Sequence, residues 1–97
     1  MKTREEIIRL LMPVFEKNGT KKATLFGSYA KGTQTENSDL DILVDSGLHG
    51  LRFYGLLEDV CQAVDMPVDL IDVYQLEKDG SMSKDIERTG MTIYERA

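Results

Sequence analysis

The chain is 97 residues long, which allows one small hydrophobic core and one functional site. It carries 12 Lys and Arg against 17 Asp and Glu, and the resulting net charge of −5 argues against direct nucleic-acid binding. A single cysteine and a single histidine exclude an internal disulfide and argue against a Cys/His zinc site, and no apolar run approaches the roughly 20 residues of a membrane span. We therefore expect one cytoplasmic domain over residues 1–97.

The first expected element is an α-helix. Thr3 and Glu6 have the spacing of a capping box, in which each side chain satisfies a backbone N–H group at the helix start. Apolar residues then recur at helical intervals until Gly19, which ends the pattern. Pro13 lies inside this pattern and predicts a kink or a split, because its ring meets the carbonyl four residues earlier. The short apolar run over residues 23–26 predicts a buried strand.

The rest of the chain alternates between strand and helix patterns. A polar, glycine-bearing loop, with or without a turn of helix, is expected over 27–38. The following segments are expected to be a strand over 40–44, a helix over 51–64, a strand over 68–73, a short helix over 83–89 and an extended piece over 92–94. In the helix over 51–64, Leu51 and Tyr54 belong to the apolar face. Strands separated by helices predict an α/β or α+β fold, with a small mixed sheet covered mainly on one face by helices.

Two aspartates mark the second strand as a candidate metal site. If Leu40, Ile42 and Val44 face the core, alternation places Asp39 and Asp41 together on the opposite face. Residues two apart on a strand are roughly 6.5–7 Å apart, so both carboxylates can reach one cation. Oxygen-only ligation suits Mg²⁺.

The loop before these aspartates has the composition of a phosphate cradle. Gly27, Ser28 and Gly32 allow close approach of the backbone to a triphosphate, and Lys31 is a candidate charge partner. Ser38 is either a further nucleotide ligand or a turn residue. The loop contains neither a Walker motif nor a dinucleotide fingerprint, so its glycines and serine indicate a phosphate site only together with the aspartates that follow.

A two-metal site needs a third acid, and the third strand offers Asp69 and Asp72. The two residues lie on opposite faces of that strand, and alternation does not choose between them. Asp69 is in the strand interior, where an aspartate is unusual, whereas Asp72 is nearer the end and is expected to be solvated. We prefer Asp69 and keep Asp72 as the alternative.

Taken together, these motifs resemble a known signature. The segments LFGSYAKG (25–32), SDLDILV (38–44) and VDLI (68–71) are similar to those of the minimal nucleotidyltransferases, a family of the DNA polymerase β-like superfamily. The resemblance covers nearly the whole chain, and it implies the polymerase β-like nucleotidyltransferase fold. The family often has arginine at the positions of Tyr29 and Lys31, so this chain has one cation fewer there, and Lys31 keeps the charge without a bidentate fork.

The resemblance also implies an activity. Members transfer a nucleoside monophosphate from an NTP to an acceptor hydroxyl and release pyrophosphate. Asp39 and Asp41 would hold Mg²⁺ on the triphosphate and share a second Mg²⁺ with Asp69, and Gly27 and Ser28 would hold the β- and γ-phosphates.

Minimal members are commonly antitoxins, paired with a HEPN ribonuclease toxin that they inactivate by adding AMP to a tyrosine. We therefore expect an adenylyltransferase that uses ATP and a HEPN-type partner, in a homo- or hetero-oligomer. The alternatives are an enzyme that modifies a small molecule, as aminoglycoside nucleotidyltransferases do, and a non-catalytic module that neutralises its partner by contact alone.

Overall fold

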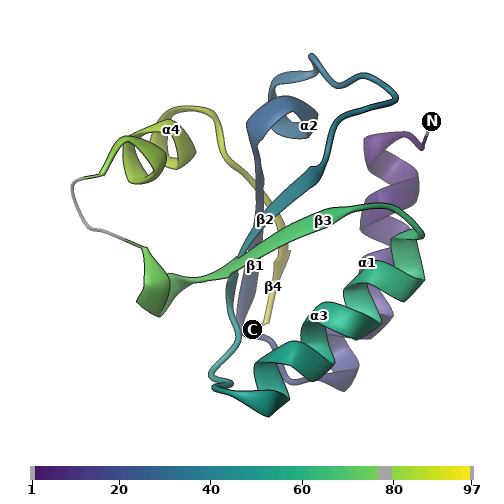
Figure 1. The fold of residues 1–97 in the computed structure, drawn as a ribbon, viewed down its shortest axis with the longest axis vertical. Helices are drawn as coiled ribbons and strands as arrows, with labels where there is room; N and C mark the ends of the chain where they lie inside the picture. Colours follow the sequence, from purple (N-terminus) through teal and green to yellow (C-terminus); the bar gives the residue numbers. More distant parts are fainter. Residues whose placement is uncertain (1, 77–79, 97) are drawn as a thin grey trace.

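The computed structural model describes residues 2–76 and 80–96. In chain order its elements are α1 (Arg4–Lys17), β1 (Lys22–Phe26), α2 (Gly27–Lys31), β2 (Leu40–Asp45), α3 (Leu51–Val64), β3 (Val68–Asp72), the 3₁₀ turn η1 (Val73–Gln75), α4 (Ser81–Thr89) and β4 (Met91–Glu95). The strands form one sheet in the order β3-β2-β1-β4 (Figure 1). β1 is antiparallel to both β2 and β4, whereas β2 and β3 are parallel, so the predicted mixed sheet is confirmed.

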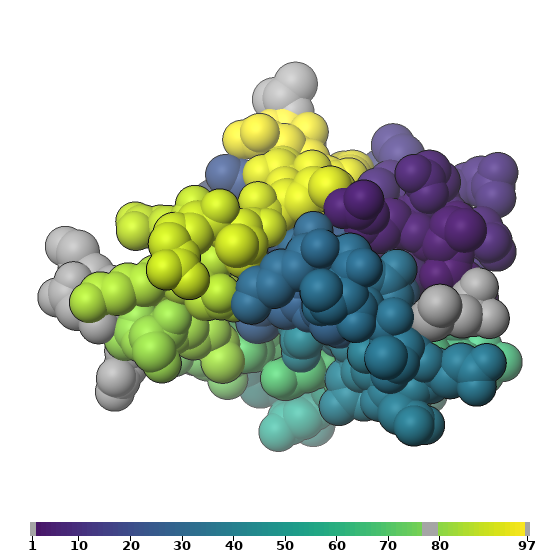
Figure 2. Space-filling model, turned by 90° about the horizontal axis from the view of Figure 1, so that it is seen from above, coloured from purple at the N-terminus to yellow at the C-terminus, as the bar shows by residue number. Residues whose placement is uncertain are grey.

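The core lies between one face of the sheet and the helices α1 and α3, which lie side by side (Figure 1). Leu40, Ile42 and Val44 of β2 are fully buried there, as their alternation predicted. Ile7 and Leu11 of α1 pack into the same cluster. The other face of the sheet, which we call the open face, is covered only in part, by α4. Figure 2 shows α2 and its following loop, in blue, lying between the yellow-green α4 and the purple start of the chain.

Most of the expected boundaries are confirmed. Thr3 and Glu6 form the capping box of α1. The helix is continuous through Pro13, so of the two expected effects, a kink or a split, the split is wrong. Pro13 and Arg9 both lie on the exposed side of α1, where water can solvate the carbonyl that the proline leaves without a donor. The last helix begins at Ser81, earlier than the expected Ser83.

The apolar face of α3 differs from the expected one. The helix spans Leu51–Val64 as predicted, but Leu51 is 88% exposed and Tyr54 is 64% exposed, whereas Phe53 and Leu56 are buried. The 3.6-residue period was therefore right, and the expected face is confirmed at Val60 and Val64, which are fully buried, but it is wrong at Leu51 and Tyr54. In residues 2–76 and 80–96, no helix combines the length and apolar character that crossing a membrane requires.

Candidate active site

Two of the predicted carboxylates lie side by side on the open face. Asp41 of β2 is in register with Asp69 of the parallel strand β3, and on its other side it is paired with Phe26, the last residue of β1. Neighbouring strands are about 4.8 Å apart, and residues in register point to the same face of the sheet. Asp39 is exposed and directly precedes β2. These acidic residues thus lie near the end of the sheet where β1 ends and α2 begins.

The electrostatics of this group favour a bound cation. Burial raises the pKa of the Asp41 carboxyl above its ordinary value, and the negative charges of Asp69 and Asp39 raise that pKa further. In the part of the chain that the structure describes, no lysine, arginine or histidine forms an ion pair with any of the three carboxylates. A cation would therefore relieve an existing repulsion.

The carboxylates are not already arranged as a ligand set. Among the described residues, no three His, Cys, Asp or Glu side chains are grouped closely enough to hold a metal ion. Repulsion between like charges opposes such grouping until a cation offsets it. The donor chemistry, three carboxylates with no ion-paired base among the described residues, fits a hard divalent cation such as Mg²⁺. The Mg²⁺ site stays a prediction.

Gly27 brings the loop backbone directly against Asp41. Its φ of +69° lies in the left-handed region that favours glycine. A Cβ atom built at Gly27 would overlap the Oδ2 of Asp41 and lie 3.1 Å from its Cγ. The glycine therefore serves two purposes, because it turns the chain from β1 into α2 and leaves space for the Asp41 carboxylate.

The structure gives other partners to two of the predicted nucleotide ligands. Lys31, at the end of α2, forms an ion pair with Asp85 of α4, with 3.1 Å between Nζ and Oδ1. The Ser38 hydroxyl accepts a hydrogen bond of 2.9 Å from the backbone N–H of Thr35, so it closes a turn in the loop. Ser28 follows Gly27 and is half-buried. Their roles as phosphate ligands remain predictions.

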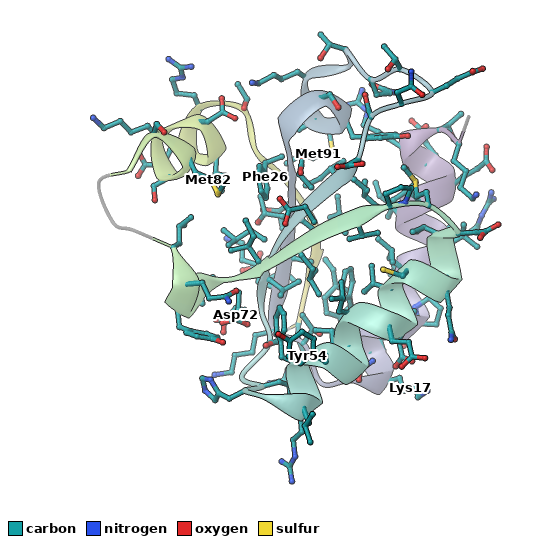
Figure 3. The ribbon with its side chains drawn as sticks, in the orientation of Figure 1. Lys17, Phe26, Tyr54, Asp72, Met82 and Met91 are labelled. Atoms are coloured by element: carbon teal, nitrogen blue, oxygen red, sulfur yellow. The ribbon has the colours of Figure 1, made fainter. Side chains whose placement is uncertain are left out.

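Asp72 is buried, and the expectation that it is solvated is wrong. Its side chain is on the helix-covered face and the residue is only 3% exposed. The carboxylate accepts hydrogen bonds from the backbone N–H and the hydroxyl of Ser46 and from the backbone N–H of Tyr74. Phe26 and Asp72 lie at opposite ends of the sheet (Figure 3). Asp72 is therefore far from Gly27, and its oxygens already have donors.

Tyr29, where the family often has arginine, is a core residue. It is 2% exposed and belongs to the main hydrophobic cluster. Its accessible edge lines a separate pocket together with Asp65 and Met66 at the end of α3. The departure from arginine at this position thus affects packing away from the three carboxylates.

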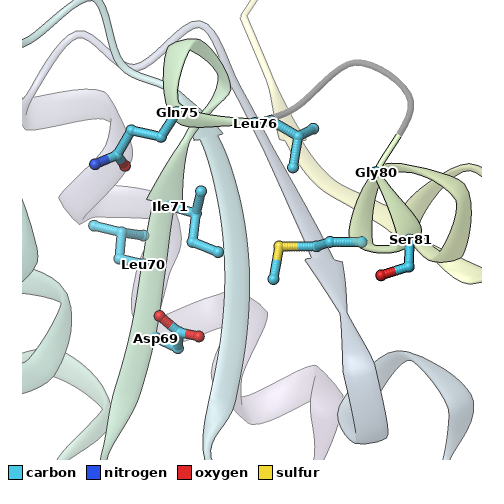
Figure 4. Close-up of a pocket in the computed structure, with 8 residues that line it drawn as sticks. Asp69, Leu70, Ile71, Gln75, Leu76, Gly80 and Ser81 are labelled. Carbon is cyan, nitrogen blue, oxygen red and sulfur yellow. The ribbon is translucent and has the colours of Figure 1, made fainter.

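A pocket of about 490 Å³ opens beside Asp69 on the open face (Figure 4). Asp69 lies at one end and Gln75 and Leu76 lie at the other, with Ile71 between them. Met82 of α4 also lines the pocket. This volume is in the range of small-molecule sites. Sequence reasoning predicted Asp69 but missed Ser81, Met82 and Asp85, because no motif marks residues that only the placement of α4 brings to the site.

The sequence of residues 6–97 matches the family described as "Polymerase beta, Nucleotidyltransferase". The chain belongs to this nucleotidyltransferase family.

Individual relatives are similar over parts of the chain. A candidate protein adenylyltransferase of Methanocaldococcus jannaschii is 52% identical over 42 residues, 43% of this chain and 45% of that protein. The protein adenylyltransferase MntA of Shewanella oneidensis is 43% identical over 51 residues, 50% of this chain and 37% of MntA. The matched segments thus span less than half the length of these two relatives.

The fold is also similar to that of solved structures. A chain in the crystal structure of a toxin–antitoxin complex with AMP-PNP superposes with a TM-score of 0.77 and 26% identity. The superposition covers 92% of this chain and 73% of that one. The expected polymerase β-like nucleotidyltransferase fold is thereby confirmed.

Proposed function

We propose that this chain transfers AMP from ATP to a hydroxyl group of a partner protein, and that the partner is a HEPN-type toxin which the transfer neutralises. The observation that carries the proposal is the contact of the Gly27 backbone with Asp41, beside Asp69 on the next strand. The similarity to MntA and to a toxin–antitoxin chain crystallised with AMP-PNP supports the nucleotide and the class of acceptor.

In this proposal the start of α2 binds the triphosphate. The backbone N–H groups and the hydroxyl at Gly27 and Ser28 donate hydrogen bonds to the β- and γ-phosphate oxygens. Because Gly27 abuts Asp41, a triphosphate held by this loop has its α-phosphate next to the carboxylates. Asp39, Asp41 and Asp69 would hold Mg²⁺, which when bound offsets the charge of the triphosphate and of the leaving pyrophosphate.

The reaction is a displacement at the α-phosphorus. The acceptor hydroxyl oxygen attacks on the side opposite the pyrophosphate, and a new P–O bond forms to the acceptor. The bond from the α-phosphorus to the bridging oxygen breaks, and pyrophosphate leaves with the electron pair. Asp69, which borders the pocket, accepts the hydroxyl proton. The residues thus orient both reactants and provide the base.

Label transfer tests the proposal directly. The chain is incubated with a HEPN-type protein as the acceptor and with ATP labelled at the α- or the γ-phosphate. We expect the partner to gain label from the α-position only, and we expect Asp41→Asn with Asp69→Asn to abolish that transfer. Asp59→Asn is the matched control, because it removes one carboxylate from α3, on the covered side of the sheet.

A measurement of partner neutralisation and a second acceptor, an aminoglycoside, added to this experiment separate the alternatives. If the double variant neutralises the partner as well as the wild type does, the chain acts by contact alone and the catalytic proposal is wrong. If label passes to an aminoglycoside and not to the protein, the chain is a small-molecule nucleotidyltransferase.

A further inference from the structure

The ion pair between Lys31 and Asp85 connects the phosphate loop to α4. Their Nζ and Oδ1 atoms are 3.1 Å apart, and the two side chains are 41% and 28% exposed. Figure 2 shows the surfaces of α2 and α4 in contact. The other ion pair in the described residues, Lys17 with Asp59, joins α1 to α3 at a longer 3.8 Å. The distance between the charged atoms is therefore shorter in the Lys31–Asp85 pair, and this pair lies beside the candidate site.

Lys31 is placed to act on the same ligand as Gly27 and Ser28. Residues three and four apart share one side of a helix, so Lys31 lies on the side of α2 where those two residues lie. It is also the only lysine or arginine between Lys22 and Arg52 in the sequence. The loop itself thus supplies one ammonium group, which Asp85 already holds, whereas the Arg4 guanidinium reaches the loop from α1 and donates a hydrogen bond to the Ala30 carbonyl.

We propose that Asp85 competes with the triphosphate for Lys31, so that α4 sets the affinity of the site for the nucleotide. The inference rests on the proposed function. A phosphate oxygen must either take the ammonium group from Asp85 or share it with a carboxylate that repels the phosphate. In both cases the Asp85 charge weakens nucleotide binding. Asp85 acts through Lys31 and is a positioning residue, not a catalytic one.

The competition also couples the nucleotide to α4. Coupling between two interactions is reciprocal, so a triphosphate that takes Lys31 weakens the tie between α4 and α2 by the same factor. α4 begins at Ser81 and Met82, which line the pocket beside Asp69. Nucleotide binding therefore loosens the helix that borders the pocket beside Asp69.

The test measures the Kd of AMP-PNP with Mg²⁺ by calorimetry at low ionic strength. For Asp85→Asn we expect a Kd about two- to fivefold lower than that of the wild type, the range that one exposed ion pair supports. For Asp85→Glu, which keeps the carboxylate, we expect the Kd of the wild type. In steady-state transfer, Asp85→Asn lowers KM by a similar factor and leaves kcat unchanged, a split that a purely structural role would not produce.

Two controls isolate the Lys31 pair. Asp59→Asn removes the same charge from the other ion pair and leaves the Kd unchanged. In a Lys31→Met background, we expect Asp85→Asn to change the Kd of AMP-PNP by less than half as much as it does in the wild-type background, because no ammonium group is left to release. The inference is wrong if Asp85→Asn binds AMP-PNP no more tightly than the wild type does. It is also wrong if Asp85→Asn tightens binding as much in the Lys31→Met background as in the wild-type background. In both cases the proposed function stands. A wild type that fails to bind AMP-PNP overturns both.

Discussion

Replacing Gly27 with alanine places a methyl group where the Asp41 carboxylate lies. The added Cβ overlaps Oδ2 and lies 3.1 Å from Cγ of Asp41, so the carboxylate must move. The backbone is also affected, since φ at Gly27 is +69°. The substitution thus combines a conformational cost, which affects stability, with a displacement of Asp41, which affects chemistry.

The two costs can be given magnitudes. The left-handed conformation costs an L-residue roughly 1–2 kcal/mol, and each kcal/mol lowers the melting midpoint of a domain of this size by about 4–8 °C. Misplacement of a reacting group by about 1 Å reduces the rate on the order of 100-fold. We expect Gly27→Ala to lose AMP transfer by at least that factor while it remains folded.

Gly47→Ala is the matched control. Gly47 has φ of +70°, but an added Cβ there has no atom within 4 Å. It should therefore lose the same stability and keep full transfer activity. Both variants are compared by thermal melting and by transfer of α-labelled AMP at a temperature where each is folded. If Gly27→Ala retains the activity of Gly47→Ala, the contact between Gly27 and Asp41 is not what positions the carboxylate for the reaction.

Three further predictions follow from the carboxylates. Because the pKa of Asp41 is raised in the folded protein, ionisation of this carboxyl destabilises the fold as the pH rises through that pKa. We therefore expect Asp41→Asn to have a higher melting temperature than the wild type at neutral pH and the same melting temperature in acid. This variant should not transfer AMP. Asp72→Ala leaves the donors at Ser46 and Tyr74 unpaired and should lose about 3 kcal/mol in urea unfolding, whereas Asp69→Ala should stay within about 0.5 kcal/mol. Mg²⁺ at about 100 times its Kd should stabilise the wild type by about 2.7 kcal/mol and Asp41→Asn by much less, and equal stabilisation would exclude Asp41 as a ligand.

Local sequence signals predicted the elements well and their orientation less well. The bounds of α3 follow from its apolar period, but apolar residues occur on two sides of this helix, including Leu51, Phe53, Tyr54 and Leu56. A period alone cannot say which side meets the sheet. That choice is made by the loops on either side of α3 and by α1, which packs against it. The error is thus confined to the start of α3, because Val60 and Val64 belong to both the expected and the observed face.

The site was predicted as a set of residues but not as a set of contacts. Gly27, Asp39 and Asp41 are close in sequence, so their motif could be recognised. The contact between Gly27 and Asp41 depends on the register of β1 against β2, and the pair between Lys31 and Asp85 depends on where α4 packs. Neither the register nor the helix position leaves a local pattern, because both result from burial across the whole sheet.

The fold gives different surroundings to Asp69 and Asp72, two aspartates between which the alternation of the strand could not choose. They are three residues apart on one strand and therefore on opposite faces, with opposite surroundings. On the covered face, a carboxylate is stable only if donors satisfy it, and Ser46 and Tyr74 supply them. On the open face, the Asp69 carboxylate accepts no hydrogen bond from the residues that the structure describes and lies beside Asp41, so its oxygens stay available for the cation that we predict. A carboxylate that stabilises the fold uses up the same lone pairs that a cation would need, and one residue cannot serve both purposes.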